Sequence, residues 1–158
     1  MPNQGSLFKK VLFCTDFSEN ADLAFNYAKE IAESAPENEL TILHVIPEPE
    51  AQFWQSYLYE SDNVDDEHAR QAVKKAIDEH YLSKLSENQR VTVQILLGRD
   101  YEKILTYAKE QNMDLIVIGR QGKSEIGTIL FGNVTEKITR HADCNVLVVP
   151  RSYMDSTC

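Results

Sequence analysis

The chain has 158 residues, of which 42% are hydrophobic and 26% charged, a composition typical of a folded globular protein rather than a disordered one. Its formal net charge of -9 argues against nucleic acid as a partner, because binding to phosphate backbones depends on clustered Lys and Arg. No apolar run approaches the roughly 20 residues of a membrane-spanning helix, and no signal peptide is recognisable, so we expect a cytosolic protein without a membrane contact.

The cysteines and histidines form no pattern that binds a metal. Cys14, Cys144 and Cys158 make no C-x-x-C motif, and the four histidines lack metal-ligand spacing. We expect reduced thiols, with Cys14 and Cys144 as small apolar strand residues. The pattern assigns neither a metal ligand nor a catalytic residue.

The chain begins with a strand, a helix and a second strand. Residues 11–15 are an almost continuous apolar run, typical of a parallel strand that is buried on both faces. Ser18 can cap the following helix, whose apolar residues recur at helical spacing until Pro36 ends the pattern. Residues 40–46 are the second predicted strand.

Residues 47–66 form the longest irregular stretch and contain six acidic residues and no basic one. They also contain the large apolar side chains Phe53, Trp54, Tyr57, Leu58 and Tyr59. Two interpretations stay open: a lid or partner-binding segment, or aromatic residues that pack locally beneath a solvated acidic loop. An amphipathic helix follows, with apolar residues from Ala69 to Tyr81.

The second half of the chain repeats the alternation of strands and helices. Apolar residues from Val91 predict a third strand that ends at Gly98, and Asp100 can cap the next helix. Residues 115–118 contain no polar side chain, so we expect this fourth strand to be central. The remaining elements are a glycine-rich loop, a helix at about 133–141 and a strand at 146–149. Five strands alternating with four helices predict a one-domain α/β sandwich, because right-handed crossovers keep the strands parallel.

Two segments at strand ends are candidates for a ligand site. Ligands of open parallel sheets bind beyond the carboxyl ends of the strands, where the strand order reverses. If the order is 3-2-1-4-5, Thr15 and Asp16 flank the same crevice as the loop that starts at Gly119. Glycines let several backbone N–H groups point inward, and the helix start at Asn133 adds unpaired donors and a positive dipole end. The loop therefore predicts a phosphate site, with Asp16 accepting hydrogen bonds from a ribose hydroxyl or a base amine.

Common nucleotide and catalytic motifs do not fit this loop. Gly122-Lys123-Ser124 resembles the end of a P-loop, but the first glycine of that motif would fall on Val117. No G-x-G-x-x-G follows a strand, no acidic residue ends the third strand, and no G-x-S-x-G is present. Composition alone leaves open an empty crevice whose glycines only make turns.

The spacing Gly119-x2-Gly122-x9-Gly132-Asn133 resembles the G-x2-G-x9-G-[S/T] nucleotide loop of the universal stress protein family. Four strand segments, 10–18, 43–46, 114–119 and 144–150, are also similar to that family. The resemblance implies a dimeric, flavodoxin-like and Rossmann-like three-layer α/β sandwich with a five-stranded parallel sheet of order 3-2-1-4-5. It implies a single domain over 1–158, with a core of about 8–150 and a short tail at 151–158.

The resemblance also implies ATP binding, as in one branch of the family. Asp16 would then contact the ribose and Val45 the adenine. The complete nucleotide site would comprise Thr15, Asp16, Val45, Gly119, Arg120, Gly122, Lys123, Gly132, Asn133 and Val134. Mg²⁺ or Mn²⁺ would join only through the phosphates of ATP. Two copies would pair through the last strand, at Val146, Leu147, Val148 and Val149.

The chain departs from the family pattern at two positions. Asn133 stands where the family has Ser or Thr, although an Asn amide can donate a similar hydrogen bond and is a good N-cap. Cys14 stands where many relatives have Pro. Arg120 and Lys123 either add positive charge around a triphosphate or are solvated loop cations.

We therefore predict a cytosolic, dimeric, stress-linked regulator that binds ATP. We expect at most slow ATP hydrolysis, because no residue is assigned to position water or stabilise a transferring phosphoryl group. ATP, AMP and cyclic nucleotides stay open as ligands. The alternative is an interaction or scaffold protein without nucleotide, acting through the dimer surface or residues 47–66. The glycine spacing favours the nucleotide, since a chain without phosphate to cradle would not need all three glycines.

Overall fold

Five strands and four helices alternate along the chain, in a computed structural model that describes residues 5–47, 66–120 and 132–151. The strands are β1 (Lys10–Cys14), β2 (Glu39–Pro47), β3 (Arg90–Gly98), β4 (Leu115–Gly119) and β5 (Asn145–Val149). The helices are α1 (Glu19–Glu33), α3 (Asp66–His80), α4 (Asp100–Glu110) and α5 (Asn133–His141), with a short 3₁₀ turn η1 (Leu82–Lys84) after α3. The segment predicted as a lid or an acidic loop falls almost entirely on 48–65, outside the described residues.

The strands form one parallel sheet in the order β3-β2-β1-β4-β5, which confirms the predicted order. Phe13 of β1 lies beside Ile42 of β2 and Val117 of β4, so β1 sits in the middle of the sheet. All five residues of β4 are buried, as its run of apolar side chains predicts. The carboxyl ends of β1 and β4 are therefore neighbours.

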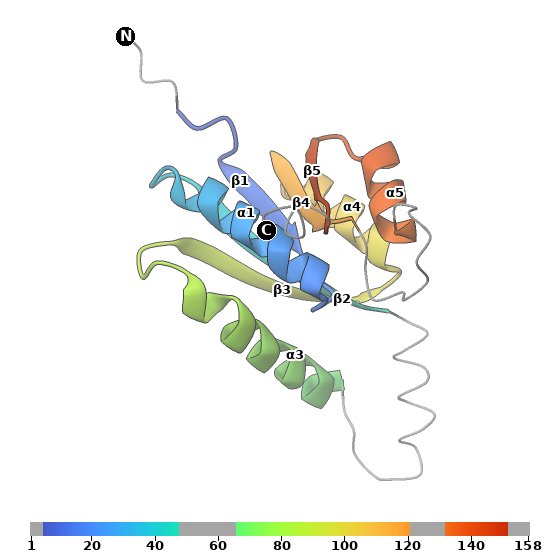
Figure 1. Cartoon of the computed structure of the whole chain (residues 1–158). Coiled ribbons are helices and arrows are strands. Elements are labelled where there is room, and N and C mark those ends of the chain that lie inside the picture. Colours follow the sequence, from blue (N-terminus) through green and yellow to red (C-terminus); the bar gives the residue numbers. More distant parts are fainter. Residues whose placement is uncertain (1–4, 48–65, 121–131, 152–158) are drawn as a thin grey trace, which may run out of the picture.

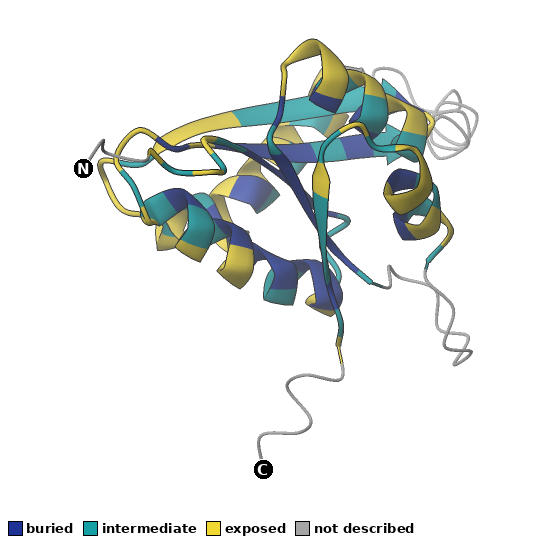
Figure 2. Ribbon diagram, turned by 90° about the horizontal axis from the view of Figure 1, so that it is seen from above, coloured by how far each residue is buried: buried dark blue, intermediate teal, exposed yellow. Residues whose placement is uncertain are grey.

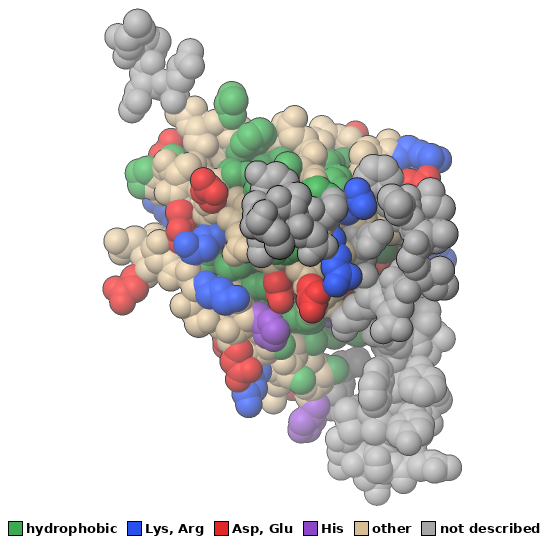
Figure 3. Space-filling model, in the orientation of Figure 1, with side chains coloured by type: hydrophobic (Ala, Val, Ile, Leu, Met, Phe, Trp, Pro, Cys, Tyr) green, Lys and Arg blue, Asp and Glu red, His purple; other side chains and the backbone are tan. Residues whose placement is uncertain are grey.

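Helices cover both faces of the sheet, with α1 and α3 on one face and α4 and α5 on the other (Figure 1). The core beneath α1 and α3 contains the rings of Phe13, Phe25 and Tyr81. The core beneath α4 and α5 contains aliphatic side chains such as Ile104, Ile116 and Ile138. Figure 2 shows the resulting gradient, with buried residues along the central strands and exposed ones on the outer faces of the helices. On the surface that α1 and α3 present, acidic and basic side chains are interspersed (Figure 3).

Local signals place the helix starts, with one correction. The Ser18 hydroxyl accepts a 3.2 Å hydrogen bond from the backbone N–H of Ala21, so Ser18 caps α1 as predicted. The cap of α4 is Arg99, not Asp100. Asp100 is instead the first helical residue, and its carboxylate accepts from the backbone N–H of Tyr101 at 2.9 Å. An acidic residue is favourable in either position, which is why the sequence does not separate them.

The two described cysteines differ in burial. Cys14 ends β1 and is 6% exposed, and burial raises the pKa of its thiol far above the ordinary value, so the thiol stays neutral. Cys144 is only half-buried and immediately precedes β5 rather than lying within it. The predicted buried strand position is therefore correct for Cys14 and wrong for Cys144. No helix in the described ranges is long and apolar enough to cross a bilayer.

Candidate functional site

The carboxyl ends of β1 and β4 meet at a point where the chain leaves the sheet in opposite directions. The helix after β1, α1, packs on one face, whereas the helix after β4, α5, packs on the other (Figure 1). This divergence is the topological switch point of an open α/β sheet, the usual place for a ligand. We call this region the β1/β4 edge. Its β1 side is 15–18, and its β4 side is 119–120 together with 132–135.

On the β1 side, every backbone and side-chain polar group of Thr15 has a partner inside the chain. Its N–H donates to the carbonyl oxygen of Leu43 at 3.0 Å, and its own carbonyl oxygen lies 2.7 Å from Nδ1 of His44. Its Oγ1 accepts from the backbone N–H of Phe17 at 2.9 Å and lies 2.6 Å from the hydroxyl oxygen of Tyr81. Thr15 is only 6% exposed, so the structure presents it as a support of the loop rather than as its outer surface.

Asp16 sits in a tight turn between Thr15 and the start of α1. One of its carboxylate oxygens, Oδ1, accepts from the backbone N–H of Ser18 at 3.0 Å. Phe17 has a φ of 62°, a left-handed conformation that costs a bulky residue about 1–3 kcal/mol and persists only where neighbours enforce it. One such neighbour is His44, whose ring centroid lies 4.8 Å from that of Phe17. The position of Asp16 is therefore set from both sides.

Tyr81, directly after α3, supports the β1 side through its contact with Thr15. Tyr81 is fully buried, and its ring packs against Phe13 and Phe25 at centroid distances of 5.1 and 4.8 Å. Its hydroxyl donates to Oδ1 of Asp22 at 2.8 Å. Burial, with a further contribution from Asp22, raises the pKa of this phenol above its ordinary range, so it stays a proton donor.

The helical spacing of the sequence marks Tyr81 only as an apolar residue of a helix and does not predict this role. One signal was present, since a core position that needs only an aromatic ring is normally filled by Phe. A buried tyrosine hydroxyl needs a hydrogen-bond partner, so Tyr81 predicts a polar neighbour in the core. The identity of that neighbour depends on the tertiary fold.

Val45, the residue expected to contact adenine, lies near the carboxyl end of β2. It is 7% exposed and belongs to the core that α4 and α5 cover. The preceding residue, His44, contacts Thr15 and Phe17 of the β1 side instead. The two residues thus lie on opposite faces of the same strand, as alternation along a strand requires.

On the β4 side, Gly119 is required by packing. A Cβ at this position would lie 2.8 Å from the backbone oxygen of Asn20 in α1 and 2.9 Å from its carbonyl carbon. Real Cβ atoms essentially never approach backbone so closely, so only glycine allows β4 and α1 to make this contact. Gly119 therefore does not need a phosphate to explain it, contrary to the expectation for all three loop glycines.

Backbone hydrogen bonds tie the β4 side together. The N–H of Arg120 donates to the carbonyl oxygen of Val149 at 2.9 Å, and the N–H of Gly132 donates to the carbonyl oxygen of Arg120 at 3.0 Å. The second bond joins the end of β4 to the start of α5, so the structure brings these two predicted segments together. Gly122 and Lys123 lie outside the described residues.

Helix α5 starts at the β4 side with Gly132 as its cap, so Asn133 is the first helical residue and not the N-cap. Asn133 is exposed and Val134 is half-buried. The hydroxyl of Thr135, which is 3% exposed, donates to the carbonyl oxygen of Gly119 at 2.9 Å. In helix geometry the first backbone N–H groups have no intrahelical acceptor, so this turn offers donors and a positive dipole end to an anion.

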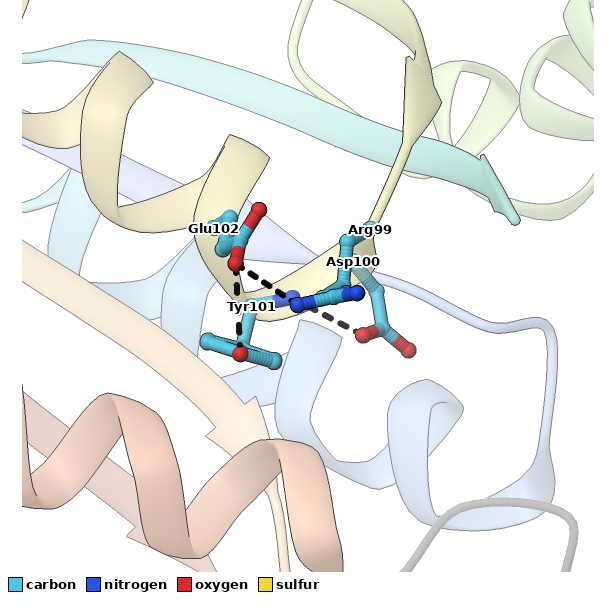
Figure 4. Close-up of polar contacts among 4 residues, drawn as sticks. All are labelled: Arg99, Asp100, Tyr101 and Glu102. Carbon is cyan, nitrogen blue, oxygen red and sulfur yellow. Dashed lines mark hydrogen bonds and ion pairs between the residues drawn. The ribbon is translucent and has the colours of Figure 1, made fainter. Parts of the chain in front are cut away.

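A polar cluster at the start of α4 borders α5 on the same face of the sheet (Figure 4). Glu102 accepts from the guanidinium of Arg99 at 3.0 Å and from the hydroxyl of Tyr101 at 3.3 Å. The ammonium of Lys137, from α5, lies 4.2 Å from the centroid of the Tyr101 ring, a cation–π contact. The Lys137 contact joins α5 to the start of α4.

A cavity of about 380 Å³ lies away from the β1/β4 edge. It opens between α4 and the end of α5, and its lining includes Met113, Ile116, His141 and Cys144. None of the predicted nucleotide-site residues that the structure describes lines it. At the β1/β4 edge a carboxylate and helix-terminal donors follow two neighbouring strands, an arrangement suited to a ligand with both hydroxyl and anionic groups.

Comparison with known proteins agrees with this geometry. A sequence profile of the universal stress protein family matches residues 7–150. Universal stress protein MJ0577 from Methanocaldococcus jannaschii is 30% identical over 92% of this chain and 96% of that protein. The solved structure of MJ0577 matches with a TM-score of 0.72 and 31% identity, over 92% of this chain and 97% of that one. UspA from Lactobacillus plantarum matches with a TM-score of 0.69 and 27% identity, over 90% and 97% of the two chains.

Two universal stress protein structures with ligands share the fold at lower identity. One, in complex with cAMP, has a TM-score of 0.59 and 22% identity, over 90% of this chain and 96% of that one. The other, from Archaeoglobus fulgidus in complex with dAMP, has a TM-score of 0.62 and 18% identity, over 90% and 98%. From the profile match over most of its length and its 30% identity to MJ0577, we conclude that the chain belongs to the universal stress protein family.

Proposed function

We propose that this universal stress protein binds an adenine nucleotide, ATP in the first place, at the β1/β4 edge and acts as a nucleotide-dependent regulator. The observation that carries the proposal is the juxtaposition at the switch point of the Asp16 turn and the start of α5, on neighbouring strands. Two proteins of the same fold form complexes with cAMP and dAMP, both adenine nucleotides. ATP, AMP and cyclic forms share the adenosine and at least one phosphate that this arrangement would recognise.

Each side of the edge would bind a different part of the nucleotide. The carboxylate of Asp16 would accept a hydrogen bond from a ribose hydroxyl, and Val45 would contact the adenine. The phosphates would lie against the β4 side and the loop, namely Gly119, Arg120, Gly122, Lys123, Gly132, Asn133 and Val134. Thr15 would act through the Asp16 turn, because its own polar groups already have partners.

A divalent cation, Mg²⁺ or Mn²⁺, would join the site through the phosphates. The donors described on the β4 side include backbone N–H groups, the Asn133 amide and the Arg120 guanidinium, which suit phosphate oxygens rather than a metal. Efficient hydrolysis requires a positioned water and a group that stabilises the transferring phosphoryl, and no residue in the described ranges is assigned either task. We therefore propose binding with, at most, slow turnover.

We further propose a homodimer that forms through β5. Among the described strands β5 pairs with β4 alone, and Val146, Leu147 and Val148 are only half-buried. At the opposite edge of the sheet the guanidinium of Arg70 donates to the carbonyl oxygen of Ile95 at 2.9 Å. This contact occupies one backbone acceptor of β3. An apolar edge strand that no described strand covers is suited to pair with a second copy. A sedimentation mass of one chain at micromolar concentration would contradict the dimer.

Calorimetric titration with ATP and Mg²⁺ tests the nucleotide proposal. We expect saturable binding of ATP by the wild-type protein. In Asp16→Ala the affinity for ATP should fall by about tenfold or more, because a hydrogen bond to a charged group is lost. Asp78→Ala is the matched control, since it removes an exposed carboxylate from α3 and changes the net charge equally. No binding of ATP, ADP or AMP by the wild type would overturn the proposal in favour of an interaction protein without nucleotide.

A further inference from the structure

Three linked hydrogen bonds, one buried and two part-buried, connect the end of α3 to the turn that carries Asp16. Asp22 of α1 accepts from the Tyr81 hydroxyl at 2.8 Å, and that hydroxyl lies 2.6 Å from Oγ1 of Thr15. Oγ1 of Thr15 in turn accepts from the backbone N–H of Phe17 at 2.9 Å. We propose that Tyr81 is a positioning residue, which holds the Asp16 carboxylate in the orientation that accepts a ribose hydroxyl. This inference rests on the proposed nucleotide function and deepens it.

The direction of these hydrogen bonds follows from counting protons. A tyrosine hydroxyl has one proton, and the Asp22 carboxylate can only accept, so this proton goes to Asp22. The 2.6 Å contact between Tyr81 and Thr15 is therefore donated by the Thr15 hydroxyl. The lone pairs of that hydroxyl remain to accept the N–H of Phe17. Each bond fixes the orientation of the next, so the orientation of the Thr15 hydroxyl depends on Tyr81.

The last bond of the chain acts on a strained part of the backbone. Phe17, with its φ of 62°, does not hold this conformation by intrinsic preference. Its N–H bond to Thr15 and the bond from the Ser18 N–H to Oδ1 of Asp16 close the turn on either side of Asp16. Loss of the Tyr81 hydroxyl frees the Thr15 hydroxyl to rotate, which weakens the first of these two bonds. Asp16 then samples orientations that do not face the ribose.

The hydroxyl of Tyr81 is not needed to fill the core. Its ring already packs against Phe13 and Phe25, and a phenylalanine would make the same ring contacts. Burying a hydroxyl costs free energy unless it is hydrogen-bonded, and the partners here are the two residues that flank the Asp16 turn in space, Thr15 and Asp22. The burial of this polar group therefore serves the geometry of the turn.

Titration of Tyr81→Phe with two nucleotides tests the proposal. We expect the affinity for ATP to fall by about tenfold, while the affinity for 2′,3′-dideoxyATP changes by less than about twofold, because that analogue has no ribose hydroxyl for Asp16 to accept. Tyr27→Phe is the control, since it removes an exposed hydroxyl from α1, and it should leave both affinities unchanged. An equal loss for both nucleotides, or no loss for either, would overturn the positioning role.

A ligand-free measurement separates this inference from the proposed function. In ¹H–¹⁵N spectra of Tyr81→Phe, the amide signals of Phe17 and Ser18 should shift, and those in Tyr27→Phe should not. Asp22→Asn keeps the Tyr81 ring and an acceptor for its hydroxyl, so it should shift the same signals less. This variant replaces Tyr81→Phe in the test if Tyr81→Phe does not fold. Unchanged Phe17 and Ser18 signals would overturn the inference even in a protein that binds ATP. Shifted signals in a protein that binds no adenine nucleotide would overturn the proposed function and the ribose assignment, but not the hydrogen-bond chain.

Discussion

The two sides of the β1/β4 edge lie on neighbouring strands but are built in different ways. On the β1 side, side-chain groups hold the turn, through the hydrogen bonds of Thr15, Tyr81 and Asp22. On the β4 side the connections run mainly through backbone, and Gly119 contributes the space that its missing side chain leaves for α1. A side held by side-chain hydrogen bonds can be altered by removing a single oxygen atom, which changes the orientation of the turn while the fold persists. A side defined by close packing fails by steric overlap, and the fold is affected first.

Adding one methyl group to the β4 side should give the largest effect on stability. In Gly119→Ala the new Cβ overlaps the backbone of Asn20, which cannot move away as the end of a flexible side chain could. We expect the free energy of unfolding to fall by about 2–3 kcal/mol, measured by chemical denaturation. Gly5→Ala is the control, because its Cβ would lie 3.4 Å from the Lys9 side chain, an ordinary contact.

If Gly119→Ala were as stable as the wild type, α1 would have to shift away from β4 at little cost. The two sides of the edge would then both be adjustable, and the contrast between them would not hold. A destabilised but folded Gly119→Ala that still binds ATP would show that this glycine serves packing and not the phosphates.

Features of the fold that depend on neighbouring residues could be predicted from the sequence. The uninterrupted apolar run of β4 predicts a central strand, and β4 is buried throughout. A serine directly before an amphipathic helix predicts a cap, and Ser18 caps α1. The strand order came from the family resemblance, because strand pairing is a property of the whole chain that no local pattern encodes.

Features that depend on distant residues could not be predicted. The requirement for Gly119 comes from Asn20, and the role of Tyr81 comes from Thr15 and Asp22, all far away along the chain. Sequence spacing marks a glycine or a tyrosine as unusual but does not identify what it contacts. The glycine spacing favours a phosphate over simple turns as the reason for Gly119, whereas the close approach of α1 explains this glycine without a ligand.

The hydroxyl of Thr135 links α5 to the end of β4 by a hydrogen bond, and its loss should have an intermediate effect. It donates to the carbonyl oxygen of Gly119 at 2.9 Å and is buried. Thr135→Val keeps the shape of the side chain and removes this bond, so we expect the free energy of unfolding to fall by about 1–2 kcal/mol. Thr106→Val, at an exposed position of α4, controls for the helix propensity of valine.

The same two variants can be compared for ATP binding. If the β4 side is held mainly by backbone, Thr135→Val should weaken ATP binding by less than about threefold, because the Gly132 to Arg120 bond still places the start of α5. A loss as large as that of Asp16→Ala would contradict this view. It would show that a side-chain hydroxyl positions the phosphate donors, as Tyr81 is proposed to position the ribose acceptor.

The smallest effect is expected far from the edge, at the other end of α1. Glu33 accepts from the N–H and the hydroxyl of Ser86 at 2.9 and 2.6 Å and pairs with Lys29 at 3.0 Å. These hydrogen bonds, with Lys29 contributing, lower the pKa of the Glu33 carboxyl below its ordinary value of 4.5. A carboxyl whose pKa is lower in the folded state stabilises the fold above its unfolded pKa. That contribution is lost as the pH falls through the folded pKa.

Glu33→Gln should therefore be less stable than the wild type by up to about 1 kcal/mol at about pH 7, and the difference should shrink as the pH falls through the folded pKa of Glu33. Denaturation over a series of falling pH values measures this, with Glu30→Gln, an exposed position on the same helix, as the control. A difference that persists in acid would assign the effect to hydrogen-bond geometry instead of charge. ATP affinity should be equal in Glu33→Gln and the wild type. The hydrogen bonds that orient Asp16 start at Asp22, in the first turns of α1, and do not extend to the carboxyl end of that helix, where Glu33 lies.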